Sequence, residues 1–184
     1  MSQTTRKAQR LLWLIKNKFC SRDIEVMVPI YKSIIRPILD YSAVLWSPRF
    51  LKDISKVEAI QRRFTKMIAR LHMLSCNDRL CVCNMHSLEV RRCRGDMIDT
   101  FKLITKKYNI EFEEFFSFPP ELLRGHKFKL YKGKARVDLR RKLFCLRVIE
   151  KWNSLPVHVI EANTANVFKN RYDAYLGSLP DTTV

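Results

Sequence analysis

A stretch of nineteen residues, "RGHKFKLYKGKARVDLRRK" at positions 124–142, contains nine Lys and Arg residues and a single acid, Asp138. Apolar and aromatic side chains at Phe128, Leu130 and Tyr131 are interleaved with the cations. Successive side chains of an extended chain point to opposite faces, so one face can pack inward while the other presents positive charge. Clustered cations of this kind are typical of surfaces that contact phosphate. The alternative is a hairpin that only adds solubility.

A second set of cations lies on the clearest predicted helix, residues 51–71. At about 100° per residue, its apolar residues fall on one side, namely Ile54, Val57, Ile60, Phe64, Met67, Ile68 and Leu71. Five cations collect on the opposite side in a row about 27 Å long. A DNA duplex carries about one phosphate charge per 1.7 Å of its axis, so the row predicts several phosphate contacts. The alternative is an ordinary solvated helix face.

These two sets make up the predicted nucleic-acid-binding residues. The helix contributes Lys52, Lys56, Arg63, Lys66 and Arg70, and the basic stretch contributes Arg124, Lys127, Lys129, Lys132, Lys134, Arg136, Arg140 and Arg141.

Catalytic chemistry has little support in the sequence. Two-metal polymerases and nucleases need clustered carboxylates as hard oxygen ligands, and the chain has no Asp-Asp pair. The closest acids, Glu113 with Glu114 and Asp96 with Asp99, lie on predicted helices among core residues. The four histidines have no context that indicates a nucleophilic site. We therefore expect a protein that is not an enzyme and uses no cofactor.

One group of residues raises zinc as a weak alternative: Cys76, Cys81, Cys83 and His86. Zinc takes four sulfur or nitrogen ligands, usually from two close pairs separated by a dozen or so residues. Here the candidate ligands are crowded at irregular intervals. Because a free cysteine behaves as a small buried apolar residue, packing in the core is the simpler interpretation, and we expect no bound metal.

The overall composition indicates a folded, strongly basic protein. Apolar residues make up 47% and aromatic residues 11% of the chain, and its formal net charge is +17. Such self-repulsion favours a polyanionic partner, most commonly RNA or DNA. The sequence shows no secretory signal and no apolar run long enough to span a bilayer. We expect an intracellular protein of the nucleus or cytoplasm, without a membrane partner.

Four glycines in 184 residues favour helix as the dominant element. The predicted fold is mainly α, a multi-helix bundle with a short β-hairpin near residues 127–137. Helices are expected at 5–18, in two pieces at 21–46 with a kink or restart at Pro37, and at 51–71, 78–83, 87–108, 138–152 and 164–176. Pro119 and Pro120 mark the predicted boundary between a helical region, 1–118, and a basic hairpin with C-terminal helices, 119–184.

The order of several sequence blocks resembles a known family. The chain contains, in succession, "KAQRLLWLIK", "YKSIIRPILDYSAVLW", "EAIQRRFTKMIARL", "LEVRRCRGDMIDTFKL", "RGHKFKLYK", "WNSLPVHVIEA" and "FKNRYDAYL". This succession is similar to the C-terminal portion, thumb and post-thumb, of reverse transcriptases (RNA-directed DNA polymerases) of jockey-like, LINE-type non-LTR retrotransposons. The resemblance covers nearly the whole chain, residues 6–176.

The resemblance implies a helical region that follows the polymerase palm, with 1–118 thumb-like, and that holds the template-primer duplex and retrotransposon RNA. The family's palm motif, an aromatic residue followed by Ala-Asp-Asp, has no counterpart in this chain, and neither does its endonuclease domain. We therefore expect a non-catalytic fragment that binds nucleic acid. Two alternatives remain open: a structural module that docks onto the rest of the polymerase, and a degenerate element product without activity.

Overall fold

The structure, a computed structural model, describes residues 3–41, 43, 48, 50–120, 126–133 and 143–178. These residues are mainly helical, which confirms the predicted fold class of a multi-helix bundle. By packing, the chain divides into two compact units, Met1–Arg92 and Cys93–Val184. The division falls within one long helix, α6 (Leu88–Ile104). Each unit has its own buried core and is described separately.

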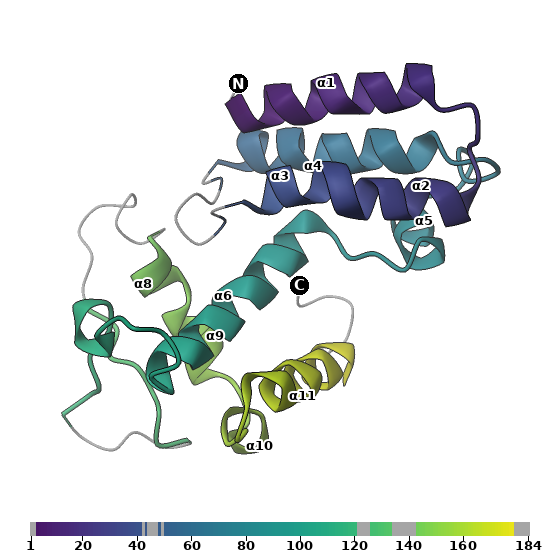
Figure 1. Cartoon of the computed structure of the whole chain (residues 1–184). Helices are drawn as coiled ribbons and strands as arrows, with labels where there is room; N and C mark the ends of the chain where they lie inside the picture. The colour runs from purple at the N-terminus through teal and green to yellow at the C-terminus, as the bar shows by residue number, and fades with distance from the viewer. Residues whose placement is uncertain are drawn as a thin grey trace. The chain divides into compact units, whose positions relative to one another are not determined.

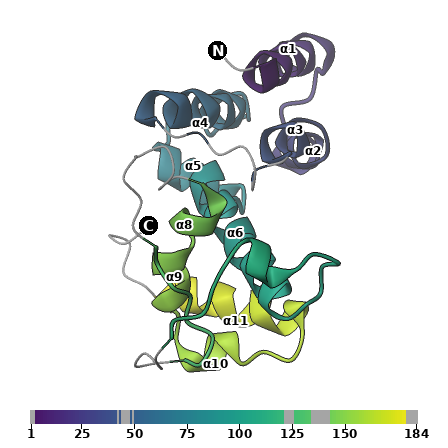
Figure 2. The same cartoon turned by 90° about the vertical axis from the view of Figure 1, so that its left-hand side faces the viewer.

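The first unit is built from short and medium-length helical segments. They are α1 (Gln3–Lys18), α2 (Ile24–Ile30), the π-helical turn η1 (Tyr31–Ile35), α3 (Arg36–Asp40), α4 (Leu51–Lys66) and α5 (Cys76–Val82). The segment α2–η1–α3 lies side by side with α1 and α4 (Figure 1), and Figure 2 views α2 and α3 nearly end on. In the core between them, the Tyr31 ring stacks on the Phe64 ring with centroids 4.5 Å apart.

Pro37, where the sequence predicts a kink or restart, lies near the start of α3 in a helical path that runs on from η1. α3 begins at Arg36 and has Pro37 in its first turn, where the missing N–H of proline is tolerated. Just before it, the N–H of Arg36 bonds to the carbonyl of Tyr31, five residues back. This π turn lets the helical path continue from α2 to α3, so that Tyr31, Ile35 and Leu39 are all buried in one core.

The predicted helix 51–71 is shorter in the structure. α4 ends at Lys66, and turns follow it. Within these turns, the N–H of Ala69 bonds to the carbonyl of Arg22, and Arg70 adopts a left-handed backbone with φ 65°. Ile68 and Leu71 are buried as the apolar pattern predicted, but turns bring them to the core. Arg70 therefore does not continue the row of cations on α4.

The second unit contains the rest of α6 and several shorter segments. They are the 3₁₀ turn η2 (Phe112–Glu114), α8 (Phe144–Arg147), α9 (Ile149–Asn153), α10 (Val157–Ile160) and α11 (Ala165–Ser178). Trp152 is completely buried. The ring of Phe168 stacks on Phe101 at 4.4 Å and lies 6.0 Å from Trp152, so α6, α9 and α11 share one aromatic core (Figure 1).

Aromatic residues that precede the Pro119–Pro120 pair pack against an aromatic residue that follows it. Before the prolines, the Phe112 ring stacks on Phe116 and on Phe118. Phe116 also meets the edge of Phe144, which follows the prolines in the chain, at 5.7 Å. The proline pair thus lies inside the second unit, whereas the packing division of the chain lies within α6.

The strand predicted at 127–131 is wrong. Residues 126–133 are described and form no strand, and the rest of the predicted hairpin, 134–137, lies outside the described residues. The physical reason is that α9 supplies the missing hydrogen-bond partners. The side-chain amide of Asn153 accepts the N–H of Leu130 at 2.8 Å and donates to its carbonyl at 2.9 Å. The indole N–H of Trp152 donates to the carbonyl of Phe128 at 2.8 Å.

His126 is expected to make the stability of this second unit depend on pH. It is buried, its Nε2 lies 3.2 Å from the Trp152 carbonyl, and its buried Nδ1 has no hydrogen-bond partner. Burial, with a smaller contribution from the Lys129 charge, lowers the pKa of His126 below its ordinary value, although the bond to Trp152 opposes this. A lowered folded pKa means that the stabilisation is complete above the unfolded pKa and is lost as pH falls towards the folded pKa.

We predict that the free energy of unfolding declines as pH is lowered from about 7 to 5, and that His126→Gln flattens this decline. Urea denaturation at a series of pH values measures the slope. His72→Gln makes the same substitution at an exposed site and is the matched control: a change of slope that is specific to His126→Gln assigns the effect to the buried site. An identical slope in the wild type and the His126→Gln protein would show that His126 does not titrate on unfolding.

Candidate nucleic-acid interface

The outer side of α4 carries exposed cations on a rigid helix. Lys52, Lys56, Arg63 and Lys66 are all exposed, while Val57, Ile60 and Phe64 on the other side are buried. From Lys52 to Lys66 the row extends about 21 Å at 1.5 Å rise per residue. The structure therefore places four of the five predicted helix cations on one surface.

Ion pairs decide which of these cations are available to an external anion. Lys56 is bound to Asp53 at 3.1 Å, on a part of the helix where both side chains are nearly half exposed. Lys52, Arg63 and Lys66 form no ion pair within the described part of the chain. We call these three residues the α4 cation row. Their positive charge is not neutralised by described acids of the protein itself.

The described part of the basic stretch lies in the second unit. Lys127 is exposed with its ammonium 5.2 Å from the centre of the Phe128 ring, and Lys129 is half-buried. Neither is ion-paired among the described residues. Lys132 is paired with Glu150 at the surface. Of the predicted residues, Arg124, Lys134, Arg136, Arg140 and Arg141 lie outside the described residues.

The zinc alternative is not supported by the positions of its residues. Cys83 is buried in the core of the first unit, whereas Cys81 and His86 are exposed. Across the described ranges, no group of three or more His, Cys, Asp or Glu side chains is placed to hold a metal ion. Cys83 packs as the small apolar residue that its surroundings favour.

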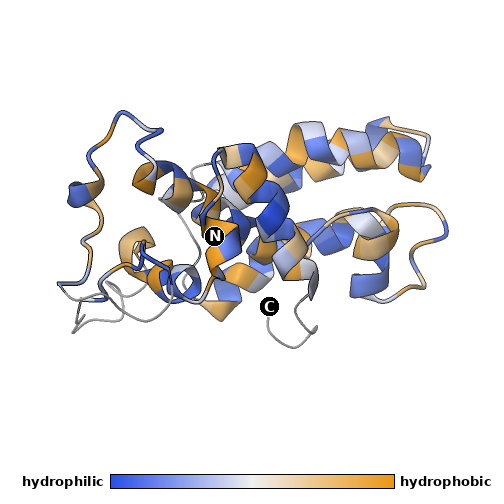
Figure 3. Ribbon diagram, turned by 90° about the horizontal axis from the view of Figure 1, so that it is seen from below, coloured by the Kyte–Doolittle hydropathy of each residue, from blue (hydrophilic) through white to orange (hydrophobic). Residues whose placement is uncertain are grey.

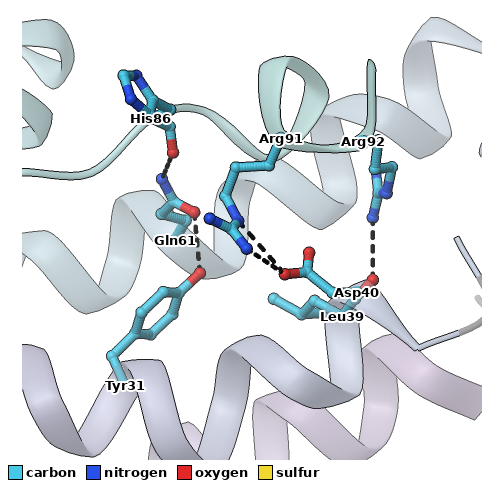
Figure 4. Close-up of polar contacts among 7 residues, drawn as sticks. All are labelled: Tyr31, Leu39, Asp40, Gln61, His86, Arg91 and Arg92. Atoms are coloured by element: carbon cyan, nitrogen blue, oxygen red, sulfur yellow. Dashed lines mark hydrogen bonds and ion pairs between the residues drawn. The ribbon is translucent and has the colours of Figure 1, made fainter. Parts of the chain in front are cut away.

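A buried polar network fixes the inner side of α4 (Figure 4). Gln61 accepts a hydrogen bond from the Tyr31 hydroxyl and donates one to the His86 carbonyl, both at 2.9 Å. Glu58, on the same helix, accepts the N–H of Glu89, and burial raises the pKa of the Glu58 carboxyl. Because buried polar groups are costly to leave unpaired, these bonds resist rotation of α4 about its axis. The α4 cation row is thereby held facing outward.

Several arginines that contribute to the positive net charge form hydrogen bonds or ion pairs within the protein. Arg91 donates from Nε and a terminal nitrogen to Asp40 at 3.3 and 3.0 Å, and the buried Arg92 donates to the Leu39 carbonyl at 3.3 Å (Figure 4). Burial lowers the pKa of the Arg92 guanidinium. The buried Arg79 bonds to Thr65 and to the Leu74 carbonyl. These cations hold the helices of the first unit together and are not available to a ligand.

Sequence reasoning missed the outer side of α1. The apolar neighbours of Trp13, Trp46 and Trp152 in the sequence predict that all three pack in the core. Trp152 is fully buried, but 62% of Trp13 is exposed. Trp46 lies outside the described residues. Helical spacing could have found this feature, because it puts Trp13 about 100° from Leu12 and about 160° from Ile15, away from the buried side. The same side of α1 carries Arg6 and Arg10, which are both exposed.

The helices alternate between hydrophilic and hydrophobic residues along their length (Figure 3). Among the described residues, none of them combines the length and the apolar character that crossing a bilayer requires. Comparison with protein-family models, with curated proteins and with solved structures finds no match to this chain.

Proposed function

We propose that this chain is a non-catalytic, nucleic-acid-binding fragment of a non-LTR retrotransposon reverse transcriptase, and that it holds template-primer RNA or DNA through phosphate contacts. The family assignment within this proposal is supported by the ordered blocks along residues 6–176. The binding function is supported above all by one structural observation. The α4 cation row is exposed on a rigid helix and is not neutralised by described acids.

The electrostatics of this row favour a phosphate backbone as the ligand. Cations that are already paired gain little from an added anion, whereas unpaired ones displace the counterions of a nucleic acid. The sequence also carries a formal charge of +17, which attracts polyanions over a long range at low salt. We expect the contacts of this row to go to phosphates, which carry no sequence information. We therefore expect binding with little sequence preference.

Salt dependence of binding tests the proposal. Each phosphate contact with duplex DNA contributes about 0.9 to the slope of log K against log salt. The triple variant Lys52→Gln, Arg63→Gln, Lys66→Gln should therefore bind a short duplex more weakly and with a slope shallower by about 2 to 3. Fluorescence anisotropy with a labelled duplex at several salt concentrations measures both quantities.

A matched control separates the row from net charge. Lys18, Lys106 and Lys107 are exposed, lie outside α4, and form no ion pair among the described residues. Replacing all three with Gln removes the same charge and should change the slope much less. Equal slopes in the two triple variants would mean that α4 is not a specific contact surface, and a wild-type protein that does not bind a duplex would refute the proposal.

A second candidate, a structural module that docks onto the rest of a polymerase, is favoured by a separate observation. Tyr41, Phe50 and Leu51 are 78%, 65% and 84% exposed. Exposed large apolar side chains are a feature of protein interfaces. In this case the isolated chain should self-associate in sedimentation analysis, and Leu51→Ser with Phe50→Ser should reduce the association. It should also bind duplexes weakly at every salt concentration.

A further inference from the structure

The outer side of α1 forms a small surface of distinctive composition. We call it the α1 outer face and define it as Arg6, Gln9, Arg10, Trp13 and Leu14, which line a hollow of about 460 Å³. The opposite side of the helix, with Thr5, Ala8, Leu12 and Ile15, is buried in the core of the first unit. The face therefore points away from the core, and its shape is set by a helix that is anchored along its length.

Trp13 is the unusual member of this face. Its indole is 62% exposed, although a tryptophan side chain gains more than almost any other from being buried. In the structure it contributes little to the packing of the core. An exposed, flat aromatic ring on a rigid helix is suited to stacking against another planar group.

The charge around Trp13 indicates what that planar group belongs to. α1, "QTTRKAQRLLWLIKNK", contains five cations and no acid. Arg6 and Arg10 are one helical turn apart, about 6 Å along the axis, and neither is ion-paired among the described residues. A protein partner would need an acidic surface with an aromatic or apolar pocket. A single-stranded nucleic acid offers both phosphates and planar bases, and each of its bases has a face for stacking.

We infer that the α1 outer face binds an unpaired stretch of nucleic acid, with one base stacked on the indole of Trp13 and the flanking phosphates paired with Arg6 and Arg10. The inference rests on the proposed function for the class of ligand, but it concerns a different surface and a different form of nucleic acid. The α4 cation row contacts backbone alone. The α1 outer face needs a base that is free of its complementary strand.

The test separates stacking from phosphate contact by using two probes with the same backbone. The full chain is titrated by fluorescence anisotropy against a labelled short oligo(dA) and against an abasic oligonucleotide of equal length. Trp13→Ala should weaken binding of oligo(dA) about tenfold, in line with the loss of one stacked base. It should leave binding of the abasic strand unchanged. Trp13→Phe, which keeps an aromatic ring, should retain most of the affinity for oligo(dA).

Met73→Ala is the control for loss of an exposed apolar side chain, since Met73 is 84% exposed in the same unit but lies outside α1. It should bind both probes like the wild type. The inference is overturned if Trp13→Ala binds oligo(dA) as tightly as the wild type does, or if it loses affinity for the abasic strand equally. Reduced self-association of Trp13→Ala without any change in oligo(dA) binding would also overturn it, and would assign the face to a protein partner.

The outcome is independent of the test of the α4 cation row. A difference between oligo(dA) and the abasic strand that depends on Trp13 supports the α1 outer face even if the chain fails to bind a duplex. Duplex binding that depends on the α4 cation row, together with no such difference, supports the proposed function and refutes this inference.

Discussion

Trp152→Ala is expected to lower the free energy of unfolding by about 3 to 5 kcal/mol, the range found when a large aromatic residue is removed from a core. Trp152 has no exposed surface, and its ring lies among His126 and Phe168. The substitution leaves a cavity and also removes the bond from the indole N–H to the Phe128 carbonyl. That carbonyl then loses its partner from α9.

The measurement is urea denaturation followed by far-ultraviolet circular dichroism, which does not depend on tryptophan fluorescence. Trp13→Ala is the matched control because it makes the same chemical change at an exposed site, and it should alter the free energy of unfolding by less than about 0.5 kcal/mol. Trp152→Phe should fall between them, since it keeps most of the ring and loses the indole N–H. Similar stabilities for the two alanine variants would contradict the assignment of Trp152 to the core.

Asp96→Leu is expected to cost about 3 to 5 kcal/mol, because it breaks a poorly accessible ion pair by removing the carboxylate that binds Arg147. The two Asp96 oxygens accept from the Nε and a terminal nitrogen of Arg147, both at 2.8 Å. The pair is poorly accessible, with 18% of the Arg147 and 9% of the Asp96 side chain exposed. Burial raises the pKa of the Asp96 carboxyl even though the guanidinium of Arg147 acts to lower it. Desolvation therefore offsets much of what the pair contributes.

The double variant Asp96→Leu, Arg147→Met tests this balance. With both charges replaced by apolar groups of similar size, most of the lost stability should return, because neither member of the ion pair then remains at the poorly accessible site. Urea denaturation of the wild type, both single variants and the double variant gives the coupling free energy. A double variant as unstable as Asp96→Leu alone would show that the ion pair itself stabilises the fold.

Elements with a strong local pattern could be predicted from the sequence. The helix of residues 51–66 follows from its apolar spacing and from the absence of glycine and proline within it. The end of α4 at Lys66 could not be predicted, because the apolar pattern continues to Leu71. What ends the helix is a long-range contact, the bond from Ala69 to the Arg22 carbonyl. Tertiary contacts here outweigh the local helical pattern.

The strand predicted at residues 127–131 fails for a related reason. Alternation of apolar and polar residues shows that one side of the segment is buried, and Leu130 is indeed buried. It does not show which groups will satisfy the backbone. The side chains of Trp152 and Asn153, more than twenty residues later, take the place of a neighbouring strand. Side-chain partners of this kind leave no periodic signal in the sequence.

The sequence indicates that the candidate surfaces are basic. It does not show which individual cations are bound to acids of the protein itself. The exposed cations of α4 follow from its helical period. The sequence does not distinguish them from Arg91 and Arg147, whose acidic partners, Asp40 and Asp96, are each 51 residues away. The number of Lys and Arg residues in the sequence therefore overstates the number of cations that are available to a ligand.

The two hydrogen bonds between Asn153 and the Leu130 backbone make the second unit sensitive to deamidation of Asn153. Asn is among the thermolabile residues, and its amide hydrolyses slowly to a carboxylate. The new carboxylate would still accept the N–H of Leu130, but it would have no hydrogen to give to the carbonyl and would place negative charge against it. Stored protein would lose the bond to the Leu130 carbonyl without any change in its gene.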